Sequence, residues 1–150
     1  MLETKNKNLI LSVVALAALA GLVFLWQGQK KPAEQARQIP RKDVPKNQVP
    51  AGFPEGIPIE PGARVIYNYE SALPDARKQA VRIFESAKSV GENLQTYLDI
   101  LAKTGWEVTS KTEIENFASI FANKAGATLG VNISKNSKTG SVEVTLNSIK

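Results

Sequence analysis

Cysteine and histidine are both absent from the 150-residue sequence, which also has a single methionine. The chain therefore cannot form disulfides, iron–sulfur clusters or Cys/His zinc sites, and it has no thiolate nucleophile. Acid–base catalysis by histidine is excluded for the same reason. The length allows one domain of ordinary size and not two.

Motifs for catalysis and nucleotide binding are missing as well: there is no G-x-S-x-G, P-loop, dinucleotide fingerprint or H-E-x-x-H. Glu113 and Glu115 fall at an expected turn, where solvated acids are common, and Ser86, Lys88 and Ser89 are explained by the start of a helix. We therefore expect a protein that is not an enzyme and has no cofactor and no metal site. The alternative is a membrane-anchored enzyme that uses carboxylate or Ser/Lys chemistry.

Positive charge is confined to the N-terminal third. The formal net charge is +5, and residues 1–52 carry eight Lys and Arg against three acidic residues. Residues 53–150 carry eleven of each sign. A nucleic-acid-binding domain would be basic itself, so we expect no nucleic-acid partner. Basic residues beside an apolar run instead indicate membrane lipid as a partner.

Residues 9–26 form an uncharged apolar run, LILSVVALAALAGLVFLW, after a short tail of residues 1–8. Eighteen helical residues span about 27 Å, enough for the hydrocarbon core of a bilayer. We expect a transmembrane helix that acts as a signal anchor. The alternative is a signal peptide cleaved at Ala20, which would leave a secreted soluble binding domain. The membrane-spanning residues include Leu9, Leu16, Gly21, Leu22 and Trp26.

Two further features concern this anchor. Ala17 and Gly21 are four residues apart, a spacing that allows two helices to approach closely and self-associate, although such pairs also arise by chance in Ala-rich spans. A strict count of flanking charge puts the domain in the cytoplasm, whereas a short N-terminal tail commonly stays inside and long domains translocate regardless of charge. We expect a single-pass protein of the cell membrane with its domain on the extracytoplasmic side.

Residues 27–57 have the composition of a Pro-rich basic linker. Seven of the eight prolines lie between Pro32 and Pro61. Proline lacks an N–H and favours an extended predecessor, so helix and sheet are both disfavoured and a mostly disordered spacer is expected. The regular apolar positions of residues 53–62 suggest a segment lying on the domain surface.

Residues 58–150 have the pattern of a small α+β domain. A helix over 90–104 is predicted by Ser89 and Glu92 at capping-box spacing, by an apolar stripe from Leu94 to Leu101 and by Gly105 at its end. Period-two alternation predicts the strands. The order is β-β-α-β-β-β-β, with one helix packed on a twisted antiparallel sheet. The predicted strands cover residues 63–70, 79–86, 106–113, 117–123, 128–134 and 141–148.

Alternation within the strands also predicts which side chains point inward and which face solvent. A face opposite the helix that is mostly uncharged and polar either binds a protein or an envelope polymer or is simply solvated. The partner-binding face would consist of Thr128, Asn132, Ser134, Glu143, Thr145 and Asn147. The inward set would be Val65, Tyr67, Val81, Ile83, Leu94, Leu98, Leu101, Trp106, Val108, Phe121, Leu129, Val131, Ile133, Val144 and Leu146.

The layout as a whole resembles uncharacterised small bacterial proteins with one N-terminal membrane anchor and a C-terminal α+β domain. The resemblance rests on the span 9–26, the sequence IPIEPGA at 57–63, Tyr97-Leu98 and Gly105-Trp106. It implies no activity or site. We expect a membrane-tethered, non-catalytic envelope protein that presents a protein- or polymer-binding surface, for example as an accessory subunit of a membrane complex.

Overall fold

The computed structural model describes residues 39–150. The predicted tail, the predicted transmembrane helix with Ala17 and Gly21, and the first part of the linker lie outside this range. Within residues 39–150, no helix is long and apolar enough to cross a membrane.

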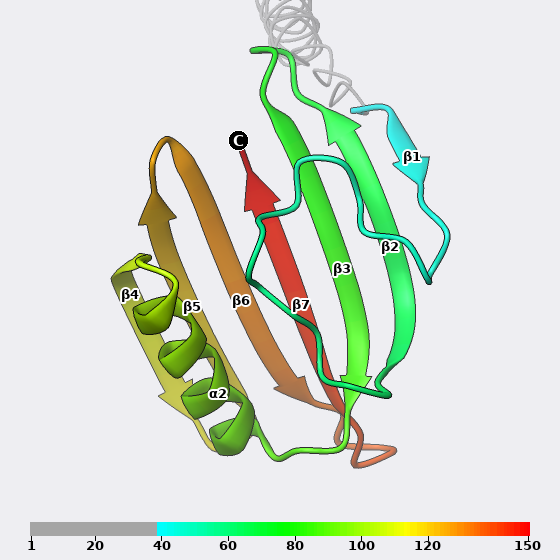
Figure 1. The fold of residues 1–150 in the computed structure, drawn as a ribbon. Coiled ribbons are helices and arrows are strands. Elements are labelled where there is room, and N and C mark those ends of the chain that lie inside the picture. Colours follow the sequence, from blue (N-terminus) through cyan, green and yellow to red (C-terminus); the bar gives the residue numbers. More distant parts are fainter. Residues whose placement is uncertain (1–38) are drawn as a thin grey trace, which may run out of the picture. The chain divides into compact units, whose positions relative to one another are not determined.

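The described residues form a seven-stranded antiparallel sheet and one helix (Figure 1). This confirms the α+β class and the single helix on an antiparallel sheet, but the order of elements is β-β-β-α-β-β-β-β, with one more strand at the start than predicted. In space the strands run β1-β2-β3-β7-β6-β5-β4. The elements are β1 (Arg41–Asp43), β2 (Arg64–Ala72), β3 (Lys78–Ser86), α2 (Val90–Lys103), β4 (Glu107–Ile114), β5 (Phe117–Lys124), β6 (Ala127–Lys135) and β7 (Val142–Ile149).

The additional strand β1 lies inside the predicted linker and pairs with β2. The chain after it, residues 44–63, is called the lead-in segment below. Its Phe53 and Ile57 are buried in the core, at 9% and 4% exposure. The structured part of the chain thus includes residues 39–57, which the sequence assigned to the spacer. Proline opposes regular ladders but not an irregular segment whose apolar side chains fit a core.

Helix α2 begins as the sequence predicts. The Ser89 side chain accepts from the Glu92 backbone N–H at 3.3 Å, and the Glu92 carboxylate accepts from the Ser89 backbone N–H at 2.8 Å. This capping box satisfies two of the free donors at the helix start. The helix packs on β4, β5 and β6, so it covers one half of one face of the sheet.

The lead-in segment crosses the other half of the same face, over β2, β3 and β7 (Figure 1). We call this side of the sheet the helix face and the other side the open face. Asn68 holds the lead-in segment in place, because its Nδ2 donates to three backbone carbonyls. These carbonyls belong to Pro45, Lys46 and Gln48, at 3.1, 3.2 and 2.8 Å.

Three residues predicted to be in the core are exposed: Tyr67 at 54%, Val108 at 39% and Phe121 at 52%. A β-bulge lies between Val65 and Tyr67, and a second one lies between Val108 and Ser110. The bulge in β2 adds one residue, so it reverses the alternation and Tyr67 faces away from the core. Val108 precedes the bulge in β4 and pairs with the buried Ala122, and it is exposed because β4 is an edge strand. In β5, the small side chains of Ala118 and Ala122 and the side chain of Ile120 meet the helix instead, while Phe121 points to the open face.

Candidate functional site

The six polar residues predicted to share a face do lie together on the open face. They come from the neighbouring strands β6 and β7, where Asn132 pairs with Thr145 and Ser134 pairs with Glu143. Their alternating neighbours Val131 and Val144 are fully buried on the helix face. We call Thr128, Asn132, Ser134, Glu143, Thr145 and Asn147 the polar patch. Their placement follows the prediction, while their role as a binding surface stays a prediction.

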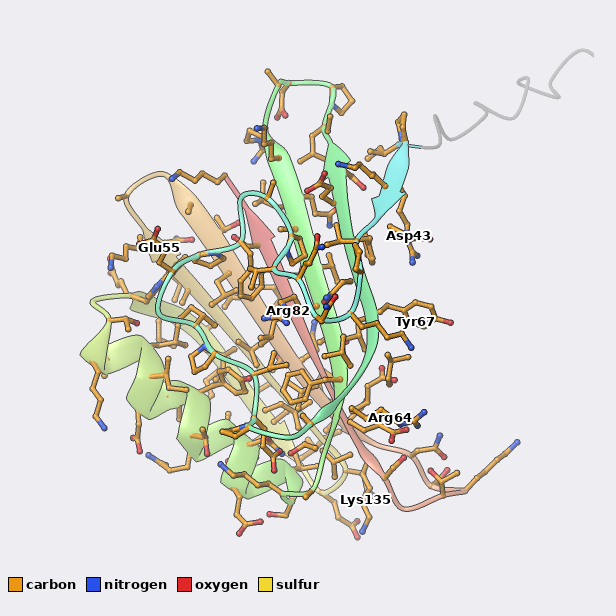
Figure 2. The ribbon with its side chains drawn as sticks, turned by 45° about the vertical axis from the view of Figure 1, so that its right-hand side comes forward. Asp43, Glu55, Arg64, Tyr67, Arg82 and Lys135 are labelled. Atoms are coloured by element: carbon orange, nitrogen blue, oxygen red, sulfur yellow. The ribbon has the colours of Figure 1, made fainter. Side chains whose placement is uncertain are left out.

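Aromatic side chains flank the polar patch on both sides, although strand alternation predicted them in the core. Phe121 of β5 pairs with Gly130 of β6. A Cβ atom placed on Gly130 would lie 3.4 Å from Cε1 of the Phe121 ring. Glycine at this position therefore gives the ring room to lie against the β6 backbone. Tyr67 projects from β2 away from α2 and the lead-in segment (Figure 2). Both rings leave more than half of their surface to solvent.

A cation covers the tyrosines at the β1 edge of the open face. The Arg41 guanidinium lies 4.0 Å from the centre of the Tyr69 ring and 5.5 Å from that of Tyr67. Arg41 also pairs with Asp43 at 2.9 Å on the same short strand. The cation–π contact orients β1 so that Arg41 and Asp43 border the aromatic end of the face, while Lys42 pairs with Glu70 on the other side.

Between these aromatic ends, neighbouring side chains of the open face pack against one another and leave no deep pocket among the described residues. Val81 lies on this face with Tyr69 and Asn147 as its partners in the neighbouring strands, and it is 2% exposed. The Gln79 amide donates to Asn147 at 3.0 Å. The face is thus a shallow platform with exposed rings at two edges and amide and hydroxyl groups between them. Such a composition can hold a flat or extended partner by stacking and hydrogen bonding.

Comparisons with protein-family models, with curated proteins and with solved structures find no match to this chain.

The side chains considered for Ser/Lys chemistry have structural roles at the start of α2. Ser86 binds the carboxylate of Glu60 and accepts from the Asn93 amide at 2.9 Å. The Lys88 ammonium donates to the Thr96 hydroxyl at 3.2 Å and not to a serine. Among residues 39–150, no group of three or more acidic side chains is placed to hold a metal ion.

A second region lies under the lead-in segment, on the helix face, and no sequence pattern predicted it. A cavity of about 510 Å³ lies between this segment and β3. Arg82 lines it and is only 8% exposed, with its guanidinium 5.6 Å from the centre of the Phe53 ring. The sequence pattern placed Arg82 on the side of its strand that faces away from Val81, but no local signal linked it to Phe53. That contact forms only when the 28 residues between them fold back.

Tyr97 of α2 contacts the end of the lead-in segment. Its hydroxyl donates to the Pro58 carbonyl at 3.0 Å and so fastens the lead-in segment to α2. Burial raises the pKa of the Tyr97 phenol because the phenolate would lose its hydration. The phenol therefore stays protonated and serves as a fixed hydrogen-bond donor.

Proposed function

We propose that this chain is a membrane-tethered, non-catalytic envelope protein that uses the open face of its sheet to bind a protein or an envelope polymer. The apolar run at residues 9–26 supports the tether. On this proposal the lead-in segment belongs to the domain, and the free part of the spacer ends before β1. The domain acts as an accessory binding module rather than by turning over a substrate.

The observation that carries the proposal is the coverage of the two faces. Within residues 39–150, α2 and the lead-in segment both lie on the helix face, and no helix or loop covers the open face (Figure 1). Yet Tyr67 and Phe121 are more than half exposed there, on either side of the polar patch. Exposed aromatic rings beside uncharged polar groups are typical of interaction surfaces.

Photo-crosslinking in the native membrane tests this proposal. A photoreactive phenylalanine replaces Thr145, in the polar patch, in the full chain expressed in its own cells. A matched chain carries the same group in place of Gln95, an exposed position on α2. We expect a discrete adduct from the Thr145 position and none from the Gln95 position, and mass spectrometry of the adduct separates a protein from a polymer partner.

A second pair of variants checks the recognition chemistry. Phe121→Ala and Tyr67→Ala should each reduce the yield of the Thr145 adduct at least about fivefold, because each removes one aromatic contact surface. Ile39→Ala, which removes an exposed apolar side chain before β1, should leave the yield unchanged. Equal adducts from the Thr145 and Gln95 positions, or no adduct from either, would contradict the proposal.

A further inference from the structure

Of the four arginines in residues 39–150, Arg82 is the one that is buried. It lies on the helix face of β3 between Ala80 and Phe84, which are both fully buried, and is itself 8% exposed. The lead-in segment runs around it, and Figure 2 shows the side chain framed by that loop. The guanidinium therefore sits in a site formed by the fold, where most of the side chain is withdrawn from solvent.

The arginines of residues 39–150 differ in how their charge is paired. Arg41, Arg64 and Arg77 are exposed, and each forms an ion pair with a carboxylate. Within that part of the chain, Arg82 has no such pair. Its Nε donates to the side-chain Oδ1 of Asn68 at 3.3 Å, and its guanidinium lies over the face of the Phe53 ring.

This distribution is the reverse of what solvation favours. A buried charge is costly unless a counter-charge and hydrogen bonds replace its water, whereas an exposed arginine needs no partner. A guanidinium has five N–H donors. Within residues 39–150 the protein supplies an acceptor for one of those of Arg82, and the terminal nitrogens reach the solvent in the cavity. Burial accordingly lowers the pKa of Arg82. A bound anion would supply both the missing charge and the missing acceptors.

The cavity beside Arg82 has room for such an anion and indicates its class. Its volume of about 510 Å³ is within the range of small-molecule sites. Its charged groups are Arg82 and Glu55, and Gly56 is the remaining non-hydrophobic residue. The apolar lining consists of Val49, Phe53, Pro54, Ile57 and Pro58. This lining suits an apolar body, and the Glu55 carboxylate opposes a ligand with a second negative charge.

We propose that the cavity under the lead-in segment binds an organic monocarboxylate with an apolar body. The carboxylate accepts two N–H bonds from the Arg82 guanidinium, and the body lies against Phe53 and Ile57. A planar guanidinium matches a carboxylate in this two-point geometry. The site is on the helix face, so it is independent of the binding role proposed for the open face.

The test uses the full chain in detergent micelles and two probes that differ in one group. N-acetyl-L-phenylalanine carries the carboxylate, and N-acetyl-L-phenylalaninamide is its neutral counterpart. Calorimetry and protein NMR should show the acid binding at least about tenfold more tightly than the amide, since a hydrogen bond to a charged group is much stronger than a neutral one. Resonances of Phe53 and Asn68 should shift with the acid.

Arg82→Gln removes the charge while keeping an amide that can bond to Asn68, and the preference for the acid should fall to less than about twofold. Arg64→Gln is the matched control, because it removes the same charge from an exposed site away from the cavity (Figure 2). It should retain the full preference. Inorganic phosphate at the same concentration should bind at least about tenfold more weakly than the acid.

Several outcomes would overturn the proposal. Equal binding of acid and amide would show an apolar cavity without anion recognition. Loss of the preference in Arg64→Gln would place recognition elsewhere. The native chain gives a test that needs no variant, because absence of acid-induced shifts at Phe53 and Asn68 would itself refute the site. In the probe-free state, Arg82→Gln should melt no lower than Arg64→Gln, and a much lower melting temperature would instead make Arg82 a structural residue.

Discussion

At the scale of single residues, Asn68 decides how the lead-in segment is held. It is 3% exposed, and its amide serves three carbonyls of that segment while its oxygen accepts from Arg82. In sequence it is an asparagine between two tyrosines in a strand, and nothing local distinguishes it from a solvated residue. Its partners lie some 20 residues earlier in the chain, so only the folded structure shows its role.

Replacing Asn68 by leucine should destabilise the domain by about 3 kcal/mol, because buried carbonyls of the lead-in segment and Arg82 lose their partner. Asn123→Leu, at an exposed position near the end of β5, should change the free energy of unfolding by less than about 0.5 kcal/mol. Urea unfolding of both variants measures the difference. Similar midpoints for the two would mean that water replaces the Asn68 amide without loss.

At the scale of elements, the sequence predicted what repeats locally and missed what does not. Alternation located six of the seven strands, and the Ser89–Glu92 spacing located the start of α2. The bulges in β2 and β4 were not predictable, because one inserted residue leaves no compositional mark yet moves Tyr67 to the open face. Strand β1 was missed because its three residues are too few to show an alternating pattern. It forms because it pairs with β2.

One of those partners makes the attachment of β1 sensitive to acid. The Glu70 carboxylate accepts from the Lys42 ammonium at 2.8 Å and from the Ala51 backbone N–H at 2.9 Å, so it holds both β1 and the lead-in segment. These two hydrogen bonds, with the Lys42 bond the larger cause, lower the pKa of Glu70. The stability they add is present above the pKa of the unfolded chain and is lost as the pH falls through the lower folded value.

Glu70→Gln should therefore have a lower melting temperature than the native chain at about pH 6, and the gap should narrow as the pH falls below about 4, because the native carboxyl takes up its proton as the pH passes through the lowered folded pKa. Calorimetric melting of both chains across this range measures the gap. Glu107→Gln, at an exposed position on β4 outside the four ion pairs of residues 39–150, should show no such pH-dependent gap. A gap for Glu70→Gln that is constant with pH would mean that its charge plays no part.

At the scale of the whole domain, the structured unit begins earlier than composition indicates. A Pro-rich segment has no secondary-structure signal, but Phe53 and Ile57 bury their side chains in the common core and Tyr97 bonds to Pro58. The candidate sites show the same limit. The polar patch was predictable because its members repeat along two strands, whereas the cavity at Arg82 is built from segments far apart in sequence.

Truncation measures what the lead-in segment contributes. A chain that begins at residue 58 should be less stable than one that begins at residue 39 by about 4 kcal/mol or more, since it no longer buries Phe53 and Ile57. Urea unfolding followed by Trp106 fluorescence compares the two, because Trp106 is the one tryptophan in both. Equal stability would mean that the lead-in segment rests on the domain without supporting it.

The position of β7 has a consequence for how this protein is made. β7 comes last in the sequence but lies in the middle of the sheet, between β3 and β6. Among residues 39–150 it is the one strand that joins the β1–β2–β3 half to the β6–β5–β4 half. Until residues 142–149 have been synthesised, each half has an unpaired strand edge next to an incomplete core. The nascent domain therefore cannot close strand by strand during translation. The sheet is completed in one late step, when β7 inserts between the edges of β3 and β6.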